Sequence, residues 1–89
     1  MPVVRIPTPL RVHTDGQDSV EAAGSTVGEV LTAVVTAHPA LRERIFDGEE
    51  VRRFVNIYIN NEDIRYLDEL ATPAAERDEI SIIPAIAGG

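Results

Sequence analysis

Few side chains in this chain are of the types that do chemistry. The 89 residues include no cysteine, which excludes disulfides, thiolate metal sites and cysteine nucleophiles. The two histidines, His13 and His38, fall in different predicted elements and lack the spacing of metal ligands. No serine has the context of a nucleophile elbow, and acidic pairs such as Glu49-Glu50 are typical of solvated loops. We therefore do not expect the chain to be an enzyme by itself.

The remaining candidate for chemistry is the carboxylate of Gly89, at the end of the stretch SIIPAIAGG. Glycine has no Cβ, so this group could pass through a narrow channel and be approached from either side. We expect residues 85–89 to form a flexible tail, which if extended reaches roughly 17 Å, far enough to enter an active site in another protein. Ile86 is expected to anchor the tail in such a channel, or else to pack loosely against the edge of its own domain. The other tail residues that we expect to contact a partner are Ala85, Ala87 and Gly88.

Length and composition bound the rest of the chain. Its 89 residues suit one domain, over 1–84, followed by the tail. The net charge of -7 argues against nucleic-acid binding through phosphates, which needs a cationic face. Such a charge suits a basic protein surface, or serves solubility alone. No segment resembles a signal peptide or a membrane span, and the absence of cysteine favours the cytoplasm.

The N-terminal half predicts two strands and a helix. Residues 3–12 read as a strand, the turn at Asp15-Gly16 favours a hairpin, and residues 19–24 read as its partner strand. Thr26 followed three residues later by Glu29 forms a capping box at the start of a helix that ends at Pro39. The apolar residues of this helix recur with helical spacing on one face: Val27, Val30, Leu31, Val34 and Val35.

The C-terminal half predicts shorter elements. A short helix is expected over 40–47, a polar loop over 48–53 and a strand over 54–60. A further short strand is expected over 64–66. The final strand, over 80–83, is apolar on both faces, which is typical of a central position.

The strand over 54–60 has one polar face. Its alternation directs Val55, Ile57 and Ile59 toward one side of the sheet. Phe54 and Tyr58 point to the other side, away from the predicted helix. We interpret these two aromatic residues as docking residues for a partner, with simple cover of the sheet as an equal alternative.

The order of the predicted elements is β, β, α, β, β, β. A right-handed crossover makes the first and last strands parallel neighbours in the middle of the sheet. The expected fold is α+β, with one main helix packed across one face of a mixed sheet of four to five strands. This is the β-grasp, or ubiquitin-like, architecture.

Two stretches carry a resemblance to a known family. RFVNIYINNEDIR and DEISIIPAIAGG resemble the ubiquitin-like bacterial sulfur carriers, which include the thiamine-pathway carrier, the small subunit of molybdopterin synthase and the carrier of an alternative cysteine pathway. The opening VRIPTPLRVHTDGQDSV and the ending PAIAGG are most similar to the cysteine-pathway carrier. The molybdopterin subunits more often have two prolines before the tail, where this chain has Pro84-Ala85.

The resemblance implies a carrier function with the cofactors held by partner enzymes. An adenylating enzyme would use ATP to convert the carboxylate of Gly89 into an acyl-adenylate, and sulfur would then replace the adenylate. In the cysteine pathway the resulting thiocarboxylate attacks an aminoacrylate held by a cysteine synthase that depends on pyridoxal phosphate (PLP). An acyl shift leaves cysteine amide-linked to the carrier, and a zinc metallopeptidase releases it.

Three other functions remain open at this point. The chain could be the small subunit of molybdopterin synthase or another thiocarboxylate sulfur carrier. The same tail would suit a ubiquitin-like modifier joined to lysines of other proteins. The chain could also be a simple interaction module whose diglycine end is incidental.

Overall fold

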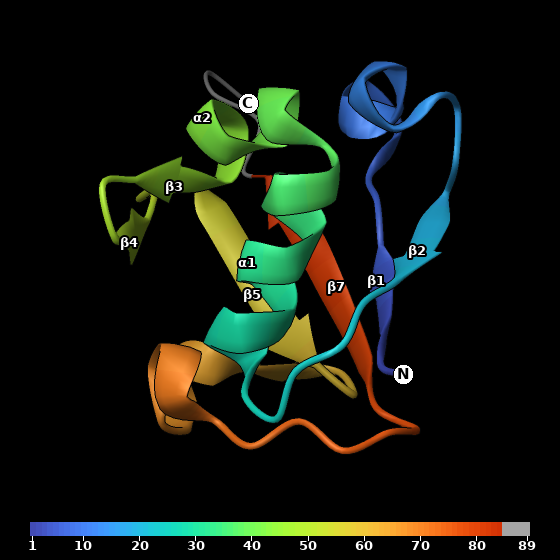
Figure 1. Ribbon diagram of the computed structural model, residues 1–89. Helices are drawn as coiled ribbons and strands as arrows, with labels where there is room; N and C mark the ends of the chain where they lie inside the picture. The colour runs from blue at the N-terminus through green and yellow to red at the C-terminus, as the bar shows by residue number, and fades with distance from the viewer. Residues whose placement is uncertain (85–89) are drawn as a thin grey trace.

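One mixed sheet with a helix across one of its faces organises the computed structural model, which describes residues 1–84 (Figure 1). Five strands lie in the order β2-β1-β7-β5-β6, and a separate two-stranded ribbon pairs β3 with β4. The strands of the main sheet are β1 (Val3–Arg5), β2 (Ser19–Glu21), β5 (Val55–Ile59), β6 (Glu62–Asp63) and β7 (Glu79–Pro84). The ribbon is formed by β3 (Phe46–Asp47) and β4 (Glu50–Val51).

The helices include one long helix and several short ones. Helix α1 (Val27–Ala37) lies in front of β5 and β7 in Figure 1, and α2 (Arg42–Ile45) follows it. The 3-10 helices are η1 (Thr8–Thr14), η2 (Pro39–Leu41), η3 (Ile64–Tyr66) and η4 (Glu69–Ala71). None of the helices within residues 1–84 has the length and apolar character needed to cross a membrane.

Strand β7 lies in the centre of the sheet, as predicted. It runs parallel to β1, with Val4 opposite Ile80, and antiparallel to β5, with Ile57 opposite Ile82. The parallel pairing of the first and last strands and the helix on one face confirm the predicted β-grasp architecture. The strand therefore carries the chain along the middle of the sheet as far as Pro84.

Helix α1 begins at the predicted cap, with one change of partner. The side-chain oxygen of Thr26 accepts a hydrogen bond of 3.1 Å from the backbone N–H of Glu29. The carboxylate of Glu29 returns not to Thr26 but to the backbone N–H and the hydroxyl of Ser25, each at 2.9 Å. The Ser25 N–H, and after it the hydroxyl, hold the pKa of Glu29 below its ordinary value.

The core lies between α1 and the sheet. The five apolar residues predicted for one face of the helix are all buried there. They meet the inward side chains of the central strands, which include Val4, Ile57, Ile80 and Ile82. Leu41 and Ile45, in the segment where a short helix was predicted, are fully buried.

The N-terminal strand is shorter than predicted. Strand β1 ends at Arg5, and residues 8–14 form the 3-10 helix η1 in place of the expected strand. The reason is that Pro7 and Pro9 fix their φ angles and donate no hydrogen bond to a ladder. The predicted turn at Asp15-Gly16 is present, with φ values of 55° and 83°, but it closes the 3-10 helix and does not connect two long strands.

Two further predictions in the C-terminal half were wrong. The expected polar loop over 48–53 contains strand β4, which pairs with β3 across Gly48 at φ +67°. The expected strand over 64–66 is the 3-10 helix η3, and the strand instead comprises Glu62–Asp63. Asp63 ends the strand because its carboxylate accepts a hydrogen bond of 2.9 Å from the backbone N–H of Arg65, which caps the helix that follows.

Candidate functional site

Strand β7 is the last described element before Gly89, the residue predicted to react. Pro84 is the last described residue, and it lies opposite Val55 at the start of β5. The residues predicted to react or to contact a partner in the tail lie outside the described residues: Ala85, Ile86, Ala87, Gly88 and Gly89. The described part of the site is therefore the surface around the end of β7.

The two predicted docking aromatics have different settings. Tyr58 lies on β5 opposite Ser81 and Asp63, on the sheet face that α1 does not cover, and it is partly buried. Phe54 is 64% exposed and lies in the turn before β5, which begins at Val55. Strand alternation therefore orients Tyr58 but does not fix the direction of Phe54.

Ile83 is an exposed apolar residue on this open face that the sequence reasoning missed. It lies opposite Asn56, whereas its neighbour Ile82 packs into the core. The side chain of Ile83 is 45% exposed, so β7 has the predicted central position but is not buried on both faces. The signal was present in Ser81, because a polar residue two positions earlier in a strand marks the same face.

A line of polar and aromatic residues crosses the open face. The register places Arg5 beside Ser81, Ser81 beside Tyr58, and Tyr58 beside Asp63. At one end Arg5 makes an ion pair of 3.9 Å with Glu79. Because both of these side chains are more than half exposed, solvent screens the pair and it contributes little.

At the other end of this line Asp63 is held in a tighter pair. Its carboxylate accepts hydrogen bonds from the guanidinium of Arg65, the shortest 2.7 Å from Nη2, and from the Arg65 backbone N–H. The side-chain hydrogen bond from Arg65, and then the backbone one, hold the pKa of Asp63 below its ordinary value. The ion pair with Arg65 therefore fixes the position of the charged Asp63 side chain at this end of the open face.

A hollow of about 430 Å³ lies beside the end of β7. It is bounded on one side by β7 and on the other by β1 and η1. Its polar lining includes Arg5 and Arg11, and its apolar lining includes Ile83 and Pro84. The remaining lining residues are Ile6, Pro7, Glu79, Ser81 and Ile82.

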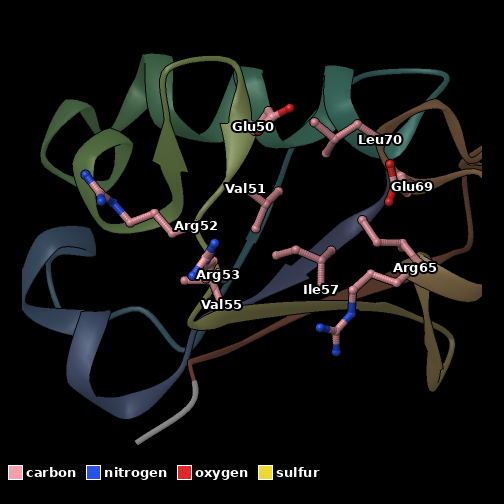
Figure 2. A pocket seen from close by; sticks show the side chains of 10 residues that line it. Glu50, Val51, Arg52, Arg53, Val55, Ile57, Arg65, Glu69 and Leu70 are labelled. Carbon is pink, nitrogen blue, oxygen red and sulfur yellow. The ribbon is translucent and has the colours of Figure 1, made fainter. Parts of the chain in front are cut away.

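A second groove, of about 410 Å³, lies between the β4 segment and β5 (Figure 2). Its lining combines apolar side chains, such as Ile57 and Leu70, with Arg52, Arg53 and Arg65. The ten residues that line it include no cysteine, histidine, serine or threonine. The lining of this groove therefore holds no thiol, hydroxyl or imidazole nucleophile, and its carboxylates are those of Glu50 and Glu69.

Within residues 1–84, no three side chains of the histidine, cysteine, aspartate and glutamate types lie together in a way that could hold a metal ion. The two histidines lie in separate elements, His13 in η1 and His38 at the end of α1.

Comparisons with known proteins agree with this arrangement. The ThiS family model matches residues 4–89. The sulfur carrier protein CysO of Mycobacterium tuberculosis is 46% identical over an alignment that covers 97% of this chain and 96% of that protein. Small archaeal modifier protein 1 of Haloferax volcanii is 36% identical over 90% of this chain and 80% of its own length.

Solved structures give the same result. In the crystal structure of the Amycolatopsis orientalis BexX/CysO complex, the matching chain is 42% identical, with a TM-score of 0.93 and full coverage of both chains. The crystal structure of Mycobacterium tuberculosis CysO matches with a TM-score of 0.88 at 43% identity, over 97% of this chain and all of that one.

Proposed function

The chain belongs to the ThiS family of ubiquitin-like sulfur carriers, and from this membership we propose that the carboxylate of Gly89 is activated and converted into a thiocarboxylate. Proteins of this kind are carriers on which enzymes act, and are not themselves catalysts. The observation that carries the proposal is the match with CysO over nearly the full length of both chains. The residue inventory supports it, because a chain without cysteine has no thiol on which to hold sulfur.

The proposed chemistry takes place in two steps on an activating enzyme. A carboxylate oxygen of Gly89 attacks the α-phosphorus of ATP, and pyrophosphate leaves. The product is an acyl-adenylate, a mixed anhydride in which a poor leaving oxygen has become a good one. Sulfide (HS⁻) released by a sulfur donor then attacks the carbonyl carbon and AMP leaves, so that one carboxylate oxygen is replaced by sulfur.

The proposed acceptor pathway is cysteine biosynthesis in the cytoplasm. The thiocarboxylate sulfur would form its new bond to a three-carbon amino-acid precursor held by a PLP-dependent cysteine synthase. After the acyl group moves from sulfur to nitrogen, a zinc metallopeptidase would hydrolyse the amide and restore the Gly89 carboxylate. ATP, PLP and zinc would all be held by these partners, and the support for this pathway is the similarity to CysO.

Docking is proposed to use the open face of the sheet. Tyr58 and Ile83 lie on this face, and Phe54 is exposed in the turn that leads into β5. Aromatic side chains are enriched in protein interfaces, and the buried core of an interface is more apolar than the rest of the surface. Contacts on this face would orient the carrier, while the residues from Ala85 to Gly89 enter the active site of the partner.

Intact mass spectrometry tests the proposal. After incubation with ATP, a sulfur donor and the cognate activating enzyme, the chain should gain the mass of one sulfur in place of one oxygen, located at Gly89. Two control chains should remain unmodified: one that lacks Gly88 and Gly89, and one with an alanine added after Gly89. Neither change removes a side chain of the folded domain, so both controls should unfold at the wild-type temperature. An unchanged wild-type mass with an enzyme shown to be active on another carrier would contradict the proposal.

A second candidate function is protein modification. It is favoured by the similarity to small archaeal modifier proteins, of which one is 36% and another 34% identical to this chain. The activated Gly89 would then form isopeptide bonds with lysines of other proteins. Higher-mass adducts linked through Gly89, recovered from cells, would support this candidate.

A further inference from the structure

We propose that Arg5 and Arg11 form a carboxylate-binding ledge beside the end of β7, and that the ledge pairs with acidic side chains of the enzyme that activates Gly89. This inference rests on the proposed function. It adds the chemistry by which the partner recognises the end of β7, next to residues 85–89. We define the ledge as these two arginines together with the hollow that they line.

The guanidinium of Arg11 is held in one orientation. Its Nε–H donates a hydrogen bond of 3.0 Å to the backbone carbonyl of Ile6, and the residue is partly buried. A guanidinium fixed through Nε still has its two terminal nitrogens for a ligand. Because these nitrogens form a planar fork that matches the two oxygens of a carboxylate, the group is suited to bidentate pairing.

The segment that carries Arg11 is unusually well fixed for a connection between two strands. It is a 3-10 helix of seven residues, although runs of this kind longer than three or four are uncommon. The backbone carbonyl of Arg11 accepts hydrogen bonds from the Gly16 N–H at 2.8 Å and from the Thr14 hydroxyl at 3.3 Å. Thr14 is fully buried, and its hydroxyl also lies 2.9 Å from the carbonyl of Gln17. These contacts fix the position of the Arg11 backbone.

Arg5 supplies the second cation of the ledge. It is the last residue of β1 and lies beside Ser81 of β7. Its side chain is 54% exposed, and its partner Glu79 is 3.9 Å away and equally exposed. Such a screened contact is readily replaced by a better carboxylate. The ion pairs within residues 1–84 include none to Arg11.

The position of the ledge connects it with the tail. The hollow is lined by Arg5 and Arg11 and also by Ile83 and Pro84, the last two described residues of β7. In Figure 1, η1 (the blue coil at the top) lies at the end of the sheet toward which β7 runs. A partner that receives residues 85–89 must therefore approach this end of the molecule.

Charge complementarity indicates the occupant. The chain as a whole carries a net charge of -7, yet the charged residues of this hollow are two arginines and one glutamate. A partner that were basic throughout would suit the overall charge but not this hollow. Where the tail extends into an active site, up to about 17 Å of chain separates the ledge from the reacting phosphate. The ligand is therefore assigned to carboxylate side chains on the rim of the enzyme and not to ATP.

The test compares four full-length chains in a pyrophosphate-release assay with the cognate activating enzyme and ATP: wild type, Arg5→Gln, Arg11→Gln and Arg77→Gln. The first two substitutions should each raise the KM for the carrier about tenfold, as expected for loss of one charge-assisted pair, with kcat little changed. The difference from wild type should shrink as salt is added, because rim charges are screened. Arg77 precedes β7 at the opposite end of the sheet, so Arg77→Gln should match wild type.

The outcomes separate this inference from the function on which it rests. If wild type releases pyrophosphate but Arg5→Gln and Arg11→Gln keep the wild-type KM at all salt concentrations, the ledge is overturned and the proposed function is not. An equal rise for Arg77→Gln also overturns it, because the effect would then be one of total charge. A wild-type chain that releases no pyrophosphate contradicts the proposed function and the ledge together. If Arg11→Gln fails to fold, Arg5→Gln still tests the ledge, because the exposed side chain of Arg5 makes only a screened contact and its loss should not affect folding.

Discussion

Ile82 and Ile83 are neighbours on β7 with the same side chain, but they belong to two different regions of the molecule. Ile82 faces α1 and is 2% exposed, whereas Ile83 faces away from it and is 45% exposed. The face that contains Ile82 holds the fold together through apolar contacts with the helix. The face that contains Ile83 bears the polar and aromatic line from Arg5 to Asp63 and adjoins the end of β7. We infer that one strand separates stability from recognition by the alternation of its side chains.

The largest expected effect is on the buried face. Ile82→Ala removes three carbon atoms from a closely packed core and should lower the free energy of unfolding by about 2–5 kcal/mol. Small domains have little stability to lose, so this change could leave a substantial unfolded fraction. Urea denaturation followed by circular dichroism measures it. If Ile82→Ala unfolded at the wild-type urea concentration, the division between the two faces would be contradicted.

A smaller effect is expected at the cap of the helix that covers this face. Thr26→Ala removes the oxygen that accepts the Glu29 N–H and should cost about 1 kcal/mol of unfolding free energy. Thr36→Ala is the matched control, because Thr36 is exposed near the other end of α1 and its hydroxyl bonds within the helix to the Thr32 carbonyl. Alanine is the better helix former at such a position, so this control should be neutral or slightly stabilising. Equal losses for both variants would contradict the capping role.

Asp63, on the open face, is expected to make a still smaller contribution to the free energy of unfolding, and this contribution depends on pH. Its pKa is lowered in the folded state, chiefly by the side-chain hydrogen bond from Arg65. A group whose folded pKa lies below its unfolded value adds stability above the unfolded pKa, and loses it as the pH falls through the folded pKa. Unfolding of wild type and Asp63→Asn, measured from pH 7 downward, should therefore differ most at pH 7 and converge in acid.

Other lowered carboxylates should cancel in this comparison. The pKa of Asp78 is also lowered, first by the Ala75 backbone N–H and then by the Asn60 side chain, but Asp78 is present in both chains. A constant difference between the two stability curves across this pH range would show that Asp63 acts through packing and not through its charge.

The elements that could be predicted from the sequence are those whose side chains repeat with a clear period. The helix from Thr26, the alternating strand around Ile57 and the central place of the last strand were all confirmed. In each case one face is buried against the core, and the spacing of the apolar residues predicts which face that is. The fold class followed from the order of these elements.

The parts that were missed depend on hydrogen bonds that have no such period. The 3-10 helix that holds Arg11 is fixed by its prolines and by the buried hydroxyl of Thr14, and η3 is fixed by the carboxylate of Asp63. Of the candidate site, the tail remains a prediction, while Tyr58 lies on the predicted face. The ledge could not be predicted, because Arg11 was expected in an extended strand over 3–12, whereas the structure places it in the 3-10 helix η1.

The smallest expected change in stability is at Ile83. Ile83→Ala should alter the free energy of unfolding by no more than about 0.5 kcal/mol, because this side chain makes few core contacts. If the open face serves for docking, the same change should nonetheless raise the KM of the carrier in the pyrophosphate-release assay. Leu67→Ala is the matched control, since Leu67 is 39% exposed and follows η3, away from β7. A KM that rises for Ile83→Ala alone, with both variants as stable as wild type, would place recognition on the open face beside β7. Equal KM values for the two variants would assign no docking role to Ile83 and would leave the face of Ile82 as the only one of the two with a demonstrated function.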